Sequence, residues 1–137
     1  MPTLTGVLET ALYVDDLDRA SRFYEELFAL IRIAGDDRFR AYSVAERSVF
    51  LLFKRGASNS VTQLRWGKLG PHDGSGPLHM AFSISTEDLA AWEKRLTAQQ
   101  IAIETRIHWP RGGTSLYFRD PDQNLLELAT PGIWSIY

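Results

Sequence analysis

Cysteine is absent from this chain of 137 residues, and its absence removes several kinds of chemistry. Without thiols the chain can form no disulfide, no thiolate metal site and no cysteine nucleophile. Any metal must be bound through imidazole and oxygen ligands, which favour Zn, Mn, Fe, Ni or Co. A chain without disulfides also suits a reducing compartment, so we expect a cytoplasmic protein.

Long apolar runs and an excess of positive charge are missing as well. No run approaches the roughly 20 apolar residues of a membrane span, and the first residues lack the features of a secretory signal. The formal net charge of -2 provides no basic surface for nucleic acid. Hydrophobic residues make up 45% of the chain, enough for one domain over residues 1–137 with a sizeable core. We expect neither nucleic acid nor a membrane as a partner.

The first part of the chain, about residues 5–55, is predicted to form a strand, a helix and three further strands. Alternating apolar residues predict the first strand over 7–14, and Glu9 falls on the opposite parity to its apolar neighbours. Asp16 is a candidate cap for a helix whose apolar residues recur at steps of three and four. Strands are predicted over 30–34, 39–44 and 48–54.

A glycine-rich connection over about 56–77, with a short element near 64–66, precedes a second series of the same kind. In this second module, about 78–130, strands are predicted over 78–84, 101–107, 114–119 and 124–129, with a helix opening at 85–88. A tail follows at 131–137. Glu9 and His79 lie 70 positions apart and Leu51 and Glu127 lie 76 apart, which indicates two βαβββ modules.

Three side chains stand out as candidate metal ligands. Glu9 and His79 lie near the starts of predicted strands, and Glu127 is the one charge within an apolar strand. A buried carboxylate is costly unless something neutralises it, and a divalent cation would do so. One imidazole and two carboxylates would leave coordination positions open for water or substrate. Spacing alone leaves the ordinary alternatives open, namely a solvent-facing Glu and a hydrogen-bonded His.

Three sequence motifs resemble those of the vicinal oxygen chelate superfamily, which contains glyoxalases, bleomycin-resistance proteins, fosfomycin-resistance proteins and extradiol dioxygenases. The resemblance covers nearly the whole chain. The motifs are LYVDDLDRASRFY at 12–24, PLHMAF at 77–82 and YFRDPDQNLLEL at 117–128.

The resemblance implies an α+β fold in which the two modules form a curled sheet around one divalent metal. His79 matches the imidazole that opens the second module, and Glu127 matches the carboxylate that closes it. Glu9 occupies the first-strand ligand position, where His or Gln is more common. Leu51 occupies a fourth position that carries an acid or amide in glyoxalase I, so that four-ligand set is incomplete.

Two further residues resemble active-site residues of the dioxygenases. Tyr117 and His108 precede Glu127 at spacings similar to those of the dioxygenase Tyr and His, and they are candidate catalytic groups. A core aromatic and a surface histidine remain the ordinary alternatives. Glu9 also replaces the first His of the dioxygenase ligand set, and no His lies where those enzymes place an acid-base His before His79.

The resemblance therefore implies a metal-dependent enzyme for a small substrate with adjacent oxygen atoms. Dioxygenase-like chemistry and lyase, isomerase or transferase chemistry both remain open. The alternatives are a ligand-sequestering protein of the bleomycin-resistance type and a metal-binding protein without turnover. Short chains of this superfamily usually pair, and the apolar tail at 133–137 also favours a homodimer.

Overall fold

The apolar faces predicted from the sequence pack into separate cores in two compact units. The computed structural model describes residues 1–137, and its units span residues 1–75 and 76–137. The connection at 56–75 belongs to the first unit. No helix is both long enough and apolar enough to cross a membrane.

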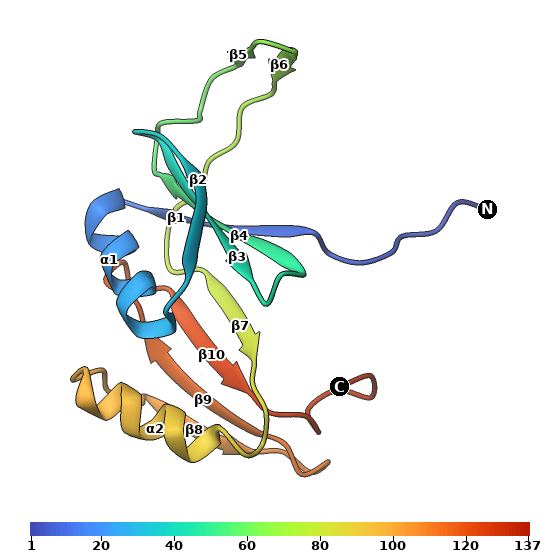
Figure 1. Cartoon of the computed structure of the whole chain (residues 1–137), viewed down its shortest axis with the longest axis vertical. Helices are drawn as coiled ribbons and strands as arrows, with labels where there is room; N and C mark the ends of the chain where they lie inside the picture. The colour runs from blue at the N-terminus through green and yellow to red at the C-terminus, as the bar shows by residue number, and fades with distance from the viewer. The chain divides into compact units, whose positions relative to one another are not determined.

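Unit 1 contains a four-stranded sheet with one helix on one of its faces (Figure 1). The sheet order is β1-β4-β3-β2, in which β1 is parallel to β4 and the other pairs are antiparallel. A two-stranded hairpin follows and extends away from this sheet (Figure 1). The elements are β1 (Glu9–Val14), α1 (Leu17–Phe28), β2 (Ile31–Gly35), β3 (Phe39–Val44), β4 (Ser48–Lys54), β5 (Thr62–Leu64) and β6 (Gly67–Leu69).

Helix α1 forms where the sequence combines a cap with an amphipathic face. The Asp16 side chain accepts a hydrogen bond from the backbone N–H of Arg19 at 3.0 Å and thereby satisfies one free donor of the first turn. Tyr24 and Leu27 on the apolar face are fully buried. The ring of Tyr24 lies 4.8 Å from the ring of Phe50 on β4, measured between centroids, so this face packs against the sheet.

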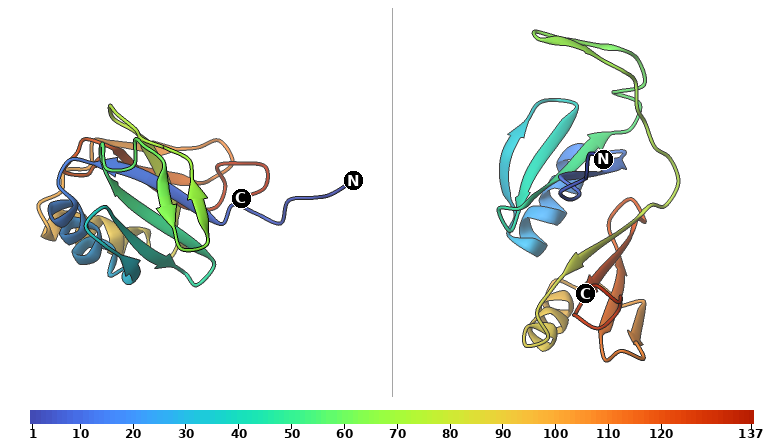
Figure 2. Two further views of the ribbon diagram at one scale, coloured as in Figure 1. Left: turned by 90° about the horizontal axis from the view of Figure 1, so that it is seen from above. Right: turned by 90° about the vertical axis from the view of Figure 1, so that its right-hand side faces the viewer.

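Unit 2 repeats this arrangement, and the predicted α+β fold with two βαβββ modules is confirmed. The sheet order is β7-β10-β9-β8, again with one parallel pair, β7 and β10. Helix α2 lies along one face of the sheet (Figure 2), above a core that includes Leu96, Leu116 and Leu128. The elements are β7 (His79–Ser83), α2 (Leu89–Ala98), β8 (Thr105–His108), β9 (Thr114–Arg119) and β10 (Leu125–Ala129).

The strand registers of the two units correspond residue by residue. Glu9 opens β1 opposite Val49 of β4, and His79 opens β7 opposite Leu125 of β10. Two residues further along, Leu51 lies opposite Ala11, and Glu127 lies opposite Ala81. Leu51 and Glu127 therefore occupy equivalent places, as the predicted repeat requires.

Some predicted boundaries were wrong. Residues 7 and 8 lie outside β1, although the carbonyl oxygen of Leu8 accepts a hydrogen bond from the N–H of Val49 on β4. The chain before them runs away from the sheet (Figure 2), and all of the first eight residues are exposed. The strand predicted over 101–107 begins only at Thr105. The preceding residues leave α2 through Gln100 at a positive φ of 58°, and pairing with β9 starts at the N–H of Glu104. The short element expected near 64–66 is instead the hairpin β5–β6.

Candidate functional site

His79 and Glu127 face each other across β7 and β10 in unit 2. Nε2 of His79 lies 3.3 Å from Oε2 of Glu127. The other ring nitrogen, Nδ1, lies 2.8 Å from the carbonyl oxygen of Leu125. A carbonyl oxygen only accepts hydrogen bonds, so Nδ1 carries a proton, and Nε2 is the ring nitrogen that faces Glu127.

The spacing between these two atoms fits two ligands of one cation. A charge-assisted N–H···O⁻ hydrogen bond is typically about 2.7–2.9 Å long, and the observed 3.3 Å exceeds this range. Two ligands at roughly 2.0–2.2 Å from a zinc-like ion in tetrahedral geometry would lie about 3.3–3.5 Å apart. The Glu127 side chain is 10% exposed and the His79 side chain is 51% exposed, so the pair is open to solvent on the His79 side.

The second oxygen of Glu127 is held by a neighbouring strand. Oε1 accepts a hydrogen bond of 2.5 Å from the hydroxyl of Ser115 on β9, and Ser115 is fully buried. The Ser115 oxygen in turn accepts a bond of 2.8 Å from the indole N–H of Trp109. Sequence reasoning missed Ser115, and it interpreted Trp109 only as part of a turn or as an aromatic that lines a pocket or the core. The available signal was strand parity, since Ser115 shares the parity of Tyr117, opposite to the apolar Leu116 and Phe118.

Tyr117 belongs to the same group of side chains. It lies directly opposite Glu127 in the strand register, and its ring stacks on the His79 ring with 6.3 Å between centroids. Burial raises the pKa of Tyr117, and the negative charge of Glu127 raises it further. The hydroxyl therefore stays protonated at neutral pH and is able to donate a hydrogen bond.

The structure does not bring His108 to this group. Directly paired strand residues share a face, and His108 pairs with Thr114, on the face opposite to Ser115 and Tyr117. Nδ1 of His108 lies 3.0 Å from the Thr114 hydroxyl. The expectation that His108 and Tyr117 act at one site therefore has no geometric support within unit 2.

Glu9, the third expected ligand, belongs to unit 1. It is the exposed first residue of β1 and shares a sheet face with Ala11 and Tyr13, because alternate strand residues point the same way. Within either unit, no three His, Asp or Glu side chains gather in the manner of a metal site. Within unit 2, His79, Glu127 and Tyr117 lie next to one another.

In unit 1, His72 lies against Tyr13, on the sheet face that also carries Glu9. The Tyr13 hydroxyl lies 2.8 Å from Nδ1 of His72, and the His72 ring meets Phe53 edge-on at 4.5 Å between centroids. Burial raises the pKa of Tyr13, and the charge of Asp73 adds to the effect. The loop carrying His72 is fixed by a bond from the Gly56 N–H to the Asp73 carboxylate.

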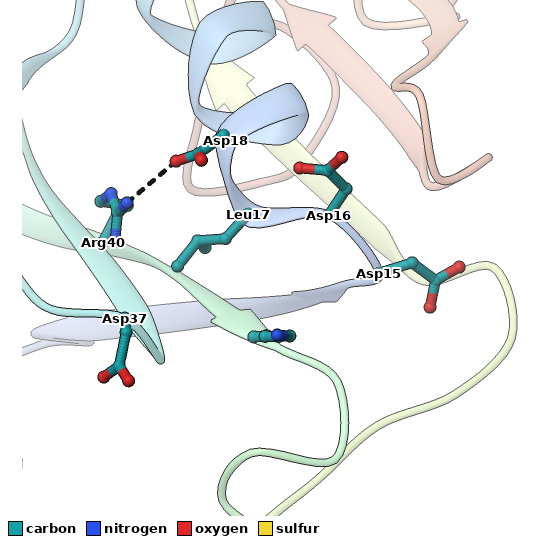
Figure 3. A pocket seen from close by; sticks show the side chains of 7 residues that line it. Asp15, Asp16, Leu17, Asp18, Asp37 and Arg40 are labelled. Atoms are coloured by element: carbon teal, nitrogen blue, oxygen red, sulfur yellow. Dashed lines mark hydrogen bonds and ion pairs between the residues drawn. The ribbon is translucent and has the colours of Figure 1, made fainter.

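A separate hollow of about 450 Å³ lies at the start of α1 (Figure 3). Three of its aspartates form ion pairs or cap the helix. Asp18 pairs with Arg40 at 3.1 Å, Asp16 caps α1, and Asp15 pairs with Arg55. Capping and ion pairing thus account for Asp15, Asp16 and Asp18. The lining residues are Asp15, Asp16, Leu17, Asp18, Asp37, Arg40 and Lys54.

Comparisons with known proteins agree with the observed fold. The family model of the Glyoxalase/Bleomycin resistance protein/Dioxygenase superfamily matches residues 6–128. The chain is 26% identical to the metallothiol transferase FosB of Bacillus licheniformis over 132 residues, which cover 96% of this chain and 79% of that protein. It is 28% identical to the fosfomycin resistance protein FosX of Listeria innocua over 128 residues, covering 91% and 89%.

Among solved structures, the chain is similar to a lactoylglutathione lyase from Agrobacterium tumefaciens. The TM-score is 0.89 and the sequence identity is 29%, with 98% of this chain and 99% of the other chain covered.

Proposed function

Because this chain belongs to the Glyoxalase/Bleomycin resistance protein/Dioxygenase superfamily, we propose that it is a metal-dependent enzyme that acts on a small substrate with adjacent oxygen atoms. His79 and Glu127 would hold one divalent ion, and Glu9 would be the third ligand. The observation that carries this proposal is the 3.3 Å approach of Nε2 of His79 to Oε2 of Glu127. When bound, the cation supplies Lewis acidity towards a substrate oxygen.

The donor set suits a divalent cation in charge as well as in spacing. Glu9 and Glu127 together carry two negative charges, and the imidazole of His79 is neutral when Nε2 is a ligand. Three protein ligands leave positions free, as catalytic sites of this kind require. The Glu127 side chain is only 10% exposed, so water screens its charge poorly and neutralisation by a cation is favoured.

Tyr117 is the residue of unit 2 best placed to contact a substrate. Its hydroxyl remains protonated because its pKa is raised, so it donates rather than abstracts a proton at neutral pH. It lies opposite Glu127 and beside His79, so it would hydrogen-bond an oxygen of a substrate held there. Tyr117 would thereby orient the substrate.

Within the superfamily we propose lyase or transferase chemistry. The similarity to a lactoylglutathione lyase and to a metallothiol transferase supports this choice. A shared role for Tyr117 and His108 was part of the case for the dioxygenase alternative, and His108 lies on the opposite face of the sheet. The side chain of Leu51 has no ligating atom, so the metal site would differ from the four-ligand site expected of glyoxalase I.

We also propose that the chain forms a homodimer. Trp134 and Ile136 in the tail are 71% and 94% exposed, while the Tyr137 hydroxyl donates to the carbonyl oxygen of Ala129 at 2.8 Å. The tail is therefore fixed to unit 2 with two large apolar side chains facing outwards. Such a patch favours burial against a second copy.

Elemental analysis of protein purified without chelators tests the metal proposal directly. We expect close to one divalent ion per chain, and the absence of any metal after titration with Mn²⁺, Zn²⁺, Ni²⁺, Co²⁺ and Fe²⁺ would contradict it. A screen of hemithioacetals, and of epoxides with a thiol, then tests the reaction class, with catechols under oxygen as the comparison. Metal-independent binding of an apolar ligand without turnover would instead favour the sequestering function.

A further inference from the structure

Three side chains form a directed hydrogen-bond chain that ends on Glu127. The indole N–H of Trp109 donates to the Ser115 oxygen at 2.8 Å, and the Ser115 hydroxyl donates to Oε1 of Glu127 at 2.5 Å. Ser115 is 0% exposed and Glu127 is 8% exposed, so water does not compete freely for these atoms. These two hydrogen bonds connect the turn between β8 and β9 to the candidate metal centre.

The direction of this chain follows from the chemistry of its members. An indole N–H only donates and an ionised carboxylate only accepts, whereas a hydroxyl does both. Ser115 must therefore accept from Trp109 and turn its single proton towards Glu127. The Ser115–Glu127 distance lies in the range of about 2.5–2.7 Å that is typical of O–H···O⁻ bonds. This bond fixes the rotation of the carboxylate.

We propose that Ser115 is a positioning residue, itself held by Trp109, which occupies Oε1 of Glu127 and leaves Oε2 beside His79 as the one ligating oxygen. The inference rests on the proposed metal centre and adds to it the way in which the carboxylate binds. Glu127 would bind through a single oxygen, because Oε1 is engaged with the Ser115 proton while Oε2 lies 3.3 Å from Nε2 of His79.

The backbone of the β8–β9 turn keeps Trp109 in place. The Trp109 N–H donates to the Gly113 carbonyl oxygen at 2.8 Å, and the Gly113 N–H donates to the carbonyl oxygen of Gly132 in the tail at 3.1 Å. A Cβ on Gly113 would come within 2.7 Å of the Gly132 carbonyl carbon, so the turn and the tail pack backbone to backbone. The position of the indole is thus determined by residues outside the metal centre.

Isothermal titration with Mn²⁺ and Zn²⁺ of chelator-treated protein tests the role of Ser115. Removing a group that orients a metal ligand typically weakens metal binding about 10–100-fold, and we expect a loss of this size for Ser115→Ala. Ser115→Thr keeps the hydroxyl and should restore most of the affinity. Trp109→Phe keeps an aromatic ring but removes the donor, so it should give a smaller loss.

Two variants separate positioning from a general loss of structure. Thr130 is a buried residue of the same unit whose hydroxyl bonds only to the backbone of Thr114 in the contacts described, and Thr130→Val should lower the melting temperature without changing metal affinity. Tyr117→Phe removes the other hydroxyl near Glu127. It should alter affinity less than Ser115→Ala, because Ser115 remains bonded to Oε1.

The fluorescence of Trp109 gives a second readout of these hydrogen bonds. Metal binding draws electron density from Glu127 and should therefore alter the hydrogen bonds of Ser115 and Trp109, which shifts the indole emission. We expect a metal-induced fluorescence change that is lost in Trp109→Phe and retained in Trp134→Phe. Trp134 serves as the control because its side chain is exposed and takes no part in the hydrogen bonds from Trp109 to Ser115 and from Ser115 to Glu127.

The possible failures point to different errors. Wild-type protein that binds no divalent metal would overturn the proposed function, and this inference with it. Wild-type binding that Ser115→Ala leaves unchanged would overturn the inference alone. Should Ser115→Ala not fold, full affinity in Trp109→Phe together with an unchanged fluorescence response would also overturn it. Weaker metal binding by Trp109→Phe, together with nearly wild-type metal affinity in Ser115→Thr, would support it.

Discussion

Gly74 passes so close to the ring of Tyr13 that a Cβ at position 74 would overlap the ring carbon atoms. The same loop carries His72, whose Nδ1 meets the Tyr13 hydroxyl, and Arg55 donates to the Gly74 carbonyl oxygen at 3.0 Å. The missing side chain at position 74 therefore allows the loop to lie against β1, the strand that carries Glu9.

Gly74→Ala should lower the free energy of unfolding by about 1–3 kcal/mol, as is typical when a methyl group is forced into a packed contact. Gly70→Ala is the matched control, because a Cβ at position 70 meets nothing within 4 Å. Urea denaturation of both variants measures the difference. Equal stability of the two variants would show that the loop moves away from Tyr13 at little cost.

Glu127→Gln should lose bound metal. The substitution keeps the volume and an oxygen atom but removes one of the two negative charges that offset the cation. In excess chelator the melting temperature should change little, whereas the stabilisation that added metal gives the wild type should disappear. Glu93→Gln is the control in the same unit, since Glu93 pairs with Arg106. Full metal occupancy in Glu127→Gln would show that Glu127 is not a ligand.

Glu9→Gln tests whether unit 1 contributes a ligand. Glu9 is exposed at the start of β1, so its replacement should leave the stability of the metal-free protein within about 0.5 kcal/mol of the wild type. Metal affinity should nevertheless fall, because a charged ligand becomes neutral. Glu46→Gln changes the same charge at an exposed turn of the same unit and should leave affinity unaltered. An equal effect of both variants would indicate only long-range electrostatics.

The ionisation of Tyr117 should report the charge of Glu127. Burial and this negative charge raise the pKa of Tyr117 above its ordinary value of 10.0, so the folded protein holds the proton more tightly than the unfolded chain. The resulting stability is fully present below pH 10 and is lost as pH rises through the folded pKa.

In Glu127→Gln the pKa of Tyr117 should move back towards 10.0, because burial remains but the negative charge is gone. NMR titration of tyrosine labelled at Cζ measures the shift, with Tyr117→Phe used to assign the resonance. An unchanged pKa in Glu127→Gln would mean that burial alone perturbs Tyr117.

Sedimentation equilibrium at micromolar concentration should show a dimer that weakens when the tail is made polar. Trp134→Ser and Ile136→Ser replace exposed side chains, so they should shift the mass towards monomer with little change in the unfolding of the monomer. Leu4→Ser replaces an exposed residue near the opposite end of the chain and is the control. A wild type that stays monomeric would contradict the proposed pairing.

The sequence predicted the fold well where periodicity reports burial. The strand at 114–119 matches β9 because its alternate residues, Leu116 and Phe118, are core residues. The strand predicted from residue 101 started too early. Ile101 is apolar like a strand residue, but it follows the end of α2, where its N–H donates to the carbonyl oxygen of Leu96. Local composition cannot distinguish these two uses of an apolar residue.

The candidate site was only partly predictable for a different reason. His79 and Glu127 stand out because each interrupts an apolar strand. A buried serine such as Ser115 has no such contrast, and its partner Trp109 reaches it from a turn six residues away. The side to which His108 points depends on a strand boundary, and an error of one residue reverses the face.

The matching registers of the two modules also have an evolutionary meaning. Tyr117 lies opposite Glu127 in unit 2, and Ala41 lies opposite the equivalent Leu51 in unit 1. Two residues before Tyr117 on the same strand, Ser115 corresponds to Phe39 of unit 1. A duplicated ancestral unit would account for the shared frame. The row is polar in unit 2, with Ser115, Tyr117 and Glu127, and apolar at the equivalent positions of unit 1, so the two modules share a backbone frame but differ in the chemistry that this row offers.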